Sequence, residues 1–401
     1  MTKKIIIVGS GFAGFWTAMG AARLIDMAAA TDIQVTLVAP EPVLGMRPRF
    51  YEADPAAMSI PIVPLLEVVG VRYIQGLVQR IHPHENAVEA IDASGKHFAL
   101  GYDRMVLATG SRLYRPEISG LREHAFSIDQ LEEACVLERH LASLARMPAT
   151  PARNTVVIVG GGFTGIEIAT ELPRRLHAAW GDDAAIKVLL IEQAASIGPE
   201  LGVGPRPVIE QALREMNVEC RLGTGVSSID ADGLITSSGE RIEAKTVIWT
   251  AGLRASSLTE QIDAPRDRLG RLHVEDDLRV TGVPNIFATG DVAFARTDDE
   301  GHHALMSCQH ALTMGRFSGH NVAADLIGRP TIPYRQPQYV TCLDLGGWGA
   351  VLTDGWDRKV KLSGADAKNI KRTINTKIIY PPAPDRAALF AAADPEAKLA
   401  V

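Results

Sequence analysis

The sequence predicts an α/β protein with two doubly wound domains, each built on a parallel sheet, and a small C-terminal region. Two segments that resemble each other, residues 3–14 and 154–165, carry this prediction. Each is an apolar, β-branched run that breaks into Gly-x-Gly-x-x-Gly and then into a helical pattern. A continuous apolar run is typical of a strand buried on both faces of a parallel sheet. Another apolar run follows each helix, at 33–38 and 186–191, which gives two strand–helix–strand units.

Further short strands are predicted between and after these units. Residues 73–78 and 87–91 are apolar runs on either side of a turn, and 104–107 is another run of this kind. Residues 246–250 and 284–289 complete the set. The last three runs each stop in a glycine or an acid, so we place their ends at turns.

The glycines of the two repeated segments indicate dinucleotide binding. The first glycine allows a tight turn, the second lets a pyrophosphate approach the backbone, and the third lets the helix pack on the strand. The helix N-terminus then holds the phosphates through its free N–H groups and its dipole. One such motif is weak evidence, but two in full strand-to-helix context are strong. The glycines concerned are Gly9, Gly11 and Gly14 in the first unit, and Gly160, Gly162 and Gly165 in the second.

An acid at the end of the second strand of each unit is expected to bind a ribose diol. Glu192 follows 186–191 directly, and Gln193 rather than a basic residue comes next. This pattern favours NADH over NADPH, because a carboxylate repels a 2′-phosphate. In the first unit the expected position is Ala39, and the acid arrives two residues later as Glu41. Glu41 is either the ribose ligand or a solvated turn carboxylate.

A helix and a hinge complete the predicted domain organisation. Residues 308–327 have helical spacing, and prolines follow them; Pro148 to Pro151 predicts a hinge. We expect a first nucleotide-binding domain split into 1–115 and 266–330, a second one at 116–265 that opens with a linker at 116–152, and a C-terminal interface region at 331–401.

Composition excludes several classes of protein. The chain has 401 residues, of which 46% are hydrophobic and 22% charged, with a net charge of −6. These values fit a folded protein rather than a disordered one, and the mildly acidic balance disfavours nucleic-acid binding. No apolar run reaches the ~18–20 residues of a membrane span. The four cysteines lie far apart without a CxxC, and the histidines lack metal spacing, so we expect no disulfide framework, no metal and a cytoplasmic location.

The order of the motifs resembles a known family. Residues 9–14, 108–110, 160–167, 249–252 and 289–291 follow the order found in flavoproteins with two dinucleotide-binding domains, the pyridine nucleotide-disulfide oxidoreductase superfamily. Within it the chain is most similar to the type II NADH dehydrogenases, which are single-subunit NADH:quinone oxidoreductases. The resemblance covers roughly residues 3–330 and includes 48–52, which is similar to that family's loop near the flavin.

The resemblance implies FAD in the first domain and NADH in the second. The implied reaction is hydride transfer from NADH C4 to flavin N5, followed by electron delivery to an acceptor, most often a quinone. The chain lacks the longer hydrophobic tail of many membrane-bound members. We therefore keep open a reductase of a ferredoxin, a rubredoxin or a small biosynthetic substrate, and a flavin-bound redox sensor.

The resemblance also implies roles for individual residues. Glu167 matches the carboxylate near the nicotinamide, although an acid in the first turn of a helix also stabilises its dipole. Gln309 and His310 border the implied acceptor site, and Asp291 matches the acid that holds the ribityl and phosphate end of FAD. The other residues assigned to the two cofactors, besides the six glycines and Glu192, are Phe12, Ala13, Glu41, Arg47, Val78, Ala108, Thr109, Gly110, Thr164, Ala251, Gly252, Gly290 and Ala311.

Two further features leave alternatives open. No cysteine precedes Cys135, which argues against disulfide-reductase chemistry near the flavin. Cys308 and Cys342 can be compared with the cysteines of sulfide:quinone oxidoreductases, but a small buried residue is the simpler interpretation of Cys308. In 366–379, Ile370, Ile374 and Ile378 recur every four residues among basic side chains. That stripe suits peripheral contact with the inner face of a membrane, a homodimer partner or the protein's own core.

Overall fold

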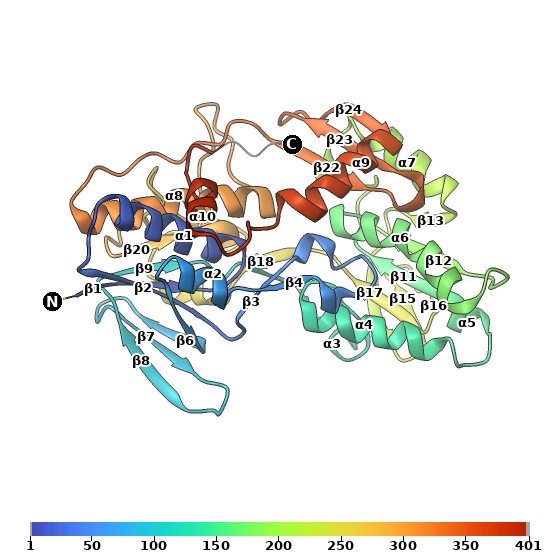
Figure 1. The fold of residues 1–401 in the computed structure, drawn as a ribbon. Helices are drawn as coiled ribbons and strands as arrows, with labels where there is room; N and C mark the ends of the chain where they lie inside the picture. The colour runs from blue at the N-terminus through green and yellow to red at the C-terminus, as the bar shows by residue number, and fades with distance from the viewer. Residues whose placement is uncertain (1, 398–401) are drawn as a thin grey trace.

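The computed structural model describes residues 2–397 and contains two large parallel sheets, one in each half of the molecule (Figure 1). The first sheet has the order β20-β9-β1-β2-β5, and every neighbouring pair in it is parallel. The strands are β1 (Lys3–Val8), β2 (Ile33–Ala39), β5 (Arg72–Gln75), β9 (Arg104–Leu107) and β20 (Ile286–Ala288). Because β20 comes from far along the chain, the second sheet is inserted within the sequence of the first.

Two helices on this sheet pack with their backbones almost touching. Helix α1 (Phe12–Met27) lies against α8 (Cys308–Ile327), and glycines line the contact. A Cβ atom added to Gly319 would lie 2.2 Å from the Thr17 carbonyl oxygen, and one added to Gly20 would lie 2.7 Å from the Arg316 carbonyl oxygen. Only glycine allows this approach, which brings the N-termini of both helices to the same edge of the sheet.

An antiparallel sheet extends from the first domain at the lower left of Figure 1. It consists of β6 (Leu77–His82), β7 (Ala87–Ile91) and β8 (His97–Gly101). The predicted single strand 73–78 is therefore wrong, because the chain leaves β5 at Gly76 and starts β6 one residue later. A side chain at position 76 would meet the Phe98 ring at 2.7 Å, so the chain turns there on a glycine.

The second sheet repeats the same design. Its order is β13-β12-β11-β17, all parallel: β11 (Thr155–Val159), β12 (Lys187–Ile191), β13 (Val218–Arg221) and β17 (Thr246–Trp249). Helix α6 (Phe163–Trp180) follows the glycine loop. Around this sheet lie α4 (Leu131–Leu144), α7 (Arg206–Glu215) and the antiparallel strands β14 (Val226–Asp230), β15 (Gly233–Thr236) and β16 (Arg241–Glu243).

Two antiparallel strands join the halves of the molecule, β10 (Ser111–Leu113) and β18 (Leu253–Ala255). The remaining small elements are β3 (Val43–Gly45), β4 (Ser59–Pro61), α2 (Val63–Val68), α3 (Leu121–His124), α5 (Pro151–Asn154), β19 (Leu272–His273) and β21 (Ala293–Phe294). The chain crosses between the halves near both strands. The exact domain limits given above stay predictions.

The C-terminal region is a small antiparallel sheet with a helix on it. The strands are β22 (Val340–Asp344), β23 (Ala350–Asp354) and β24 (Lys359–Gly364), followed by α9 (Ala365–Thr373), a π-helical turn (Ile374–Ile378) and α10 (Arg386–Ala392). Figure 1 places this sheet beside α6 and α7, whereas α10 lies on α1. Among residues 2–397, no helix combines the length and apolar character needed to cross a membrane.

Candidate functional site

The first glycine loop has the geometry of a phosphate-binding turn. Gly9 has a φ of 111°, and a Cβ on Gly14 would lie 1.9 Å from the Gly9 carbonyl oxygen, so neither position accepts a side chain. Gly11 has no neighbouring atom within 4 Å of such a Cβ. Helix α1 begins at Phe12 without a side-chain cap, which leaves its first N–H groups facing this open space.

Two threonines at the same edge of the sheet support a polar ligand there. The hydroxyl oxygens of Thr109 and Thr289, which follow β9 and β20, are buried without a hydrogen-bond partner in the part of the chain that the structure describes. Buried hydroxyls normally find partners. Together with the glycine loop, they fit the diphosphate and hydroxyl groups of a dinucleotide.

Asp291 is held where this edge meets α8. Ser111 Oγ donates to Asp291 Oδ2 over 2.6 Å, and Arg47 Nη1 lies 3.0 Å from Ser111 Oγ and 3.4 Å from Asp291 Oδ2. Arg47 also pairs with Asp129, a residue that sequence reasoning missed. Gly290 has a φ of 70°, and a Cβ there would lie 2.7 Å from that of Ala13. The structure thus brings Arg47 and Asp291 together.

The cofactor residues assigned from sequence are grouped at the same edge. Ala311 lies 3.6 Å from the position of a Gly290 Cβ, and Ala108 contacts Gly9. Glu41 is exposed at the end of β2, where Ser10 Oγ donates to the Glu41 carbonyl oxygen over 3.4 Å. Val78 is buried on β6. Phe12 is the first residue of α1, and Gly110 lies in the loop that follows β9. Each residue's role in binding FAD stays a prediction.

The second glycine loop repeats this geometry. Gly160 has a φ of 111°, and a Cβ on Gly165 would lie 1.8 Å from the Gly160 carbonyl oxygen. Gly162 faces open space, and Thr164 lies in the first turn of α6. Ala251 contacts Gly160, and Gly252 has a φ of 79°. The loop therefore leaves another helix N-terminus without a side-chain cap, as a phosphate-binding turn requires.

Glu192 has a structural contact that the sequence did not reveal. Its Oε2 accepts a hydrogen bond from the Gly161 N–H over 2.7 Å, and its Oε1 accepts one from the Ala194 N–H, also over 2.7 Å. The carboxylate is thus fixed beside the glycine loop. Each oxygen keeps a free lone pair for a ribose hydroxyl.

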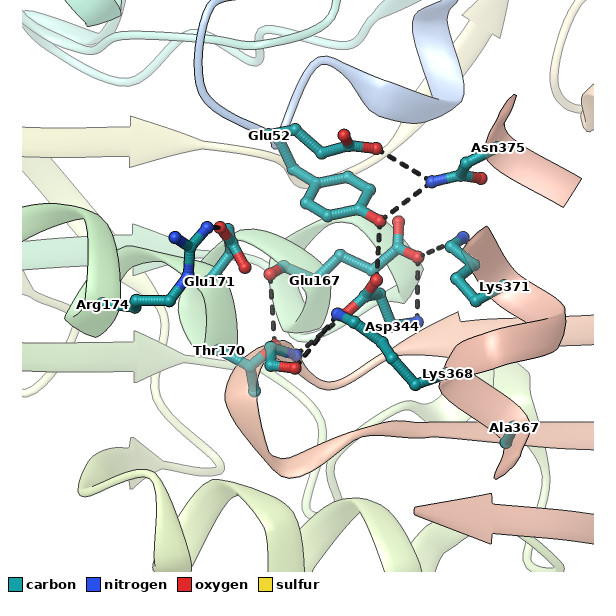
Figure 2. A network of polar contacts seen from close by, with 12 residues as sticks. Glu52, Glu167, Thr170, Glu171, Arg174, Asp344, Ala367, Lys368, Lys371 and Asn375 are labelled. Carbon is teal, nitrogen blue, oxygen red and sulfur yellow. Dashed lines mark hydrogen bonds and ion pairs between the residues drawn. The ribbon is translucent and has the colours of Figure 1, made fainter. Parts of the chain in front are cut away.

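Glu167 lies in a buried polar network between three parts of the chain (Figure 2). The carboxyl group is on α6 and is only 4% exposed. Its Oε1 accepts hydrogen bonds from Lys371 Nζ over 2.7 Å and from the Asp344 backbone N–H over 3.0 Å. Lys371 is on α9 and Asp344 ends β22, so the second domain meets the C-terminal region at this carboxylate.

The surroundings of Glu167 bring the pKa of its carboxyl group close to neutral pH. Burial raises the pKa of Glu167 to about 7; the Lys371 charge opposes this rise and the Asp344 charge adds to it. Burial lowers the pKa of Lys371, but the Glu167 and Asp344 carboxylates outweigh burial, so its net direction is upward. Lys371 remains a cation while Glu167 can gain or lose a proton.

Lys371 lies on the buried face of the amphipathic stretch. The fully buried face consists of Ala367, Lys371 and Asn375, each at most 5% exposed. Ile370 and Ile374 are only partly buried, and both pack against the cluster around Cys342. The isoleucine stripe therefore borders the protein's own core. The spacing of these three residues, four positions apart, was the only sign of this face in the sequence. Lysine is so rarely buried that the spacing alone could not predict it.

Gln309 and His310, at the start of α8, differ in their exposure to solvent. Ser307 caps this helix, and its Oγ lies 2.9 Å from His310 Nδ1. His310 is buried and stacks on Tyr339, with 5.1 Å between the ring centroids. Burial lowers the pKa of His310 to about 3, so the imidazole is neutral at physiological pH. Gln309 is partly exposed, and the catalytic roles of both residues stay predictions.

The cysteines have the properties of packed side chains. All four are free, and burial raises the pKa values of Cys308 and Cys342 to about 11. A thiol with so high a pKa is almost entirely protonated at neutral pH and is a poor nucleophile. This favours the interpretation of Cys308 as a small, packed residue, and its side chain is partly buried.

The fold and the two glycine loops define a two-domain, dinucleotide-dependent oxidoreductase. A family model described as pyridine nucleotide-disulphide oxidoreductase matches residues 3–315, and the chain belongs to this family. Membership confirms the predicted family, fold class and oxidoreductase class, and with them FAD and NADH as cofactors.

Particular relatives are similar over nearly the whole chain. An NADH dehydrogenase-like protein of Mycobacterium tuberculosis is 48% identical, with 98% of each chain covered. The demethylphylloquinone reductase NdbB of Synechocystis is 30% identical over 92% of this chain and 91% of its own. Among solved structures, NDH2 of Plasmodium falciparum in complex with NADH matches with a TM-score of 0.79 at 15% identity, covering 98% and 97% of the two chains.

Proposed function

We propose that the protein is an NADH dehydrogenase that uses FAD to pass electrons from NADH to a quinone. The relatives named as a demethylphylloquinone reductase and as type II NADH:quinone oxidoreductases support the acceptor. The observation that carries the proposal is the buried Glu167, whose pKa of about 7 suits a reaction that consumes a proton.

The balance of the reaction explains why a proton carrier is needed. NADH and quinone give NAD⁺ and quinol only when one further proton is taken from solvent. When bound, FAD supplies a two-electron carrier that receives hydride from NADH and returns the electrons to the acceptor. Glu167 Oε1 stays hydrogen-bonded to Lys371 and to the Asp344 N–H. Such a carboxyl can hold that proton and release it without leaving its position.

The remaining site residues bind and orient the two cofactors. In the first domain, the α1 N-terminus and the buried hydroxyls of Thr109 and Thr289 would hold FAD, with Arg47 and Asp291 beside them. In the second, the α6 N-terminus and Glu192 would hold NADH. No side-chain acid is needed for hydride transfer itself, so alignment is the main contribution of the protein to that step.

An anaerobic titration tests the proposal. NADH is added to the purified holoenzyme while the visible absorbance of the flavin is followed, and then a water-soluble quinone is added. We expect NADH to bleach the flavin and the quinone to restore it. If NADH bleaches the flavin but quinone does not restore it, the quinone assignment fails. If NADH does not bleach it, the dehydrogenase assignment fails as well.

A further inference from the structure

A second buried carboxylate stands beside Glu167. Asp344 ends β22, is 4% exposed, and touches Glu167 through its own backbone N–H. A buried carboxylate is costly unless it is paired, and two of them side by side repel each other. Figure 2 shows Asp344 between Glu167 and Lys368.

The Asp344 carboxylate is surrounded by hydrogen-bond donors. Its Oδ2 accepts a hydrogen bond from the Tyr51 hydroxyl over 3.0 Å. Its Oδ1 accepts from Lys368 Nζ over 2.5 Å and from the Gly346 N–H over 2.8 Å. Three donors, one of them the Lys368 cation, compensate the burial of this carboxylate.

The Glu167 carboxyl group accepts fewer hydrogen bonds than that of Asp344, and only at one oxygen. Both of its hydrogen bonds reach Oε1, from Lys371 and from the Asp344 N–H. Like charge at Asp344 disfavours the ionised form of Glu167, whereas Lys371 favours it. Because Glu167 has fewer donors and a like charge beside it, Glu167 is the carboxyl group of this pair whose pKa is raised.

We propose that Asp344 is a positioning residue for Glu167. It orients the Glu167 carboxyl group through its backbone N–H and, as a negatively charged neighbour, makes Glu167 the member of the pair that takes up and releases a proton. Lys368 and Tyr51 hold the Asp344 carboxylate in place through their hydrogen bonds. The proposal rests on the proposed function, in which Glu167 carries the proton used by the acceptor.

The other titratable groups around this pair are neutral or already paired. Burial raises the pKa values of the Cys308 and Cys342 thiols and of the Tyr51 phenol, so all three are protonated at pH 7. Glu171 on α6 pairs with Arg174, and Glu52 pairs with Arg49. Asp344, Lys371 and Lys368 are therefore the charges that decide where the proton resides.

An infrared pH titration of the holoenzyme without NADH or quinone tests the proposal. The carbonyl band of protonated carboxylic acids is followed, and the contribution of Glu167 is assigned by its loss in Glu167→Gln. Wild-type Glu167 is expected to titrate near pH 7. Asp344→Asn keeps the shape but removes the charge, and should move the midpoint to lower pH by about 1 unit. Lys368→Met removes a positive charge from the neighbourhood of Glu167 and should move the midpoint to higher pH.

The control is Asp354→Asn, which removes a half-exposed carboxylate on the neighbouring strand β23 and should leave the midpoint unchanged. Opposite shifts in the two test variants cannot come from a general loosening of the C-terminal sheet. An unchanged midpoint in Asp344→Asn, or a Glu167 that does not titrate near neutral pH, overturns the proposal. Because this experiment involves no turnover, its failure is distinct from failure of quinone to reoxidise the flavin.

Discussion

At the scale of single residues, Glu167 links the protonation of one group to the stability of the protein. Its pKa lies at about 7 in the folded protein and at 4.5 in an unfolded chain. Between these values the folded state binds more protons, so stability falls as pH rises through this window. We expect Glu167→Gln to reduce that fall in the midpoint of thermal unfolding from pH 5 to 7. The exposed Glu243→Gln should retain it, and an identical slope in all three proteins contradicts the assignment.

A substitution at Glu192 tests which domain binds which cofactor. Glu192→Ala removes the partner of the Gly161 and Ala194 N–H groups and the predicted ribose ligand. We expect the Kd for NADH to rise at least tenfold, a loss of about 1.5–3 kcal/mol for a hydrogen bond to a charged group. The FAD content per protein, measured by absorbance after purification, should be unchanged. Loss of FAD instead of NADH affinity means that the domains have been assigned in the wrong order.

At the scale of elements, two glycines of the first loop have different roles. Gly14 is required for folding, and Gly11 is predicted to be required only for binding FAD. Gly14→Ala places a Cβ 1.9 Å from the Gly9 carbonyl oxygen, and such overpacking costs about 1–3 kcal/mol of stability. Gly11→Ala meets no protein atom and should fold normally. Both variants should bind FAD weakly, but only Gly14→Ala should lower the urea midpoint of the cofactor-free protein. Normal FAD affinity in Gly11→Ala means that the phosphates lie elsewhere.

These loops were predictable because their signal is local. Twelve consecutive residues contain the strand, the turn and the start of the helix, so residues 3–14 and 154–165 specify their geometry without help from distant segments. The network around Glu167 has no such signal. Its contacts join residues 177, 204 and 293 positions apart, and they follow from the packing of α9 and β22 rather than from any pattern in either element. Lys371 looked like one of several surface lysines in a basic stretch.

At the scale of the whole molecule, one buried cluster ties three parts of the chain together. Tyr51 comes from the first domain, Glu167 from the second, and Asp344 and Lys371 from the C-terminal region. The two acids balance Lys368 and Lys371, so the cluster has no net charge when all four are ionised. Removing one member leaves another charge buried without a partner.

Lys371→Met tests this dependence. Since it leaves Glu167 buried without its cation, we expect a loss of about 3–5 kcal/mol in the free energy of unfolding at pH 8, measured by urea denaturation. The loss should shrink at pH 5, where Glu167 is protonated. Lys377→Met changes an exposed lysine on the following π-helical turn and should cost little at either pH. A loss that does not depend on pH points to packing rather than charge.

The close contact between α1 and α8 has a consequence for hydrogen exchange. At Gly20 and Gly319 the two backbones are in direct contact, so the movement of a side chain cannot let water into the interface. The amide protons of these two helices should therefore exchange only when the whole first domain unfolds, and their exchange rates report its global opening. FAD bound at the N-termini of these helices stabilises the folded domain and should slow exchange uniformly along both helices. The size of this slowing then measures the affinity for FAD. That readout requires neither NADH nor an electron acceptor.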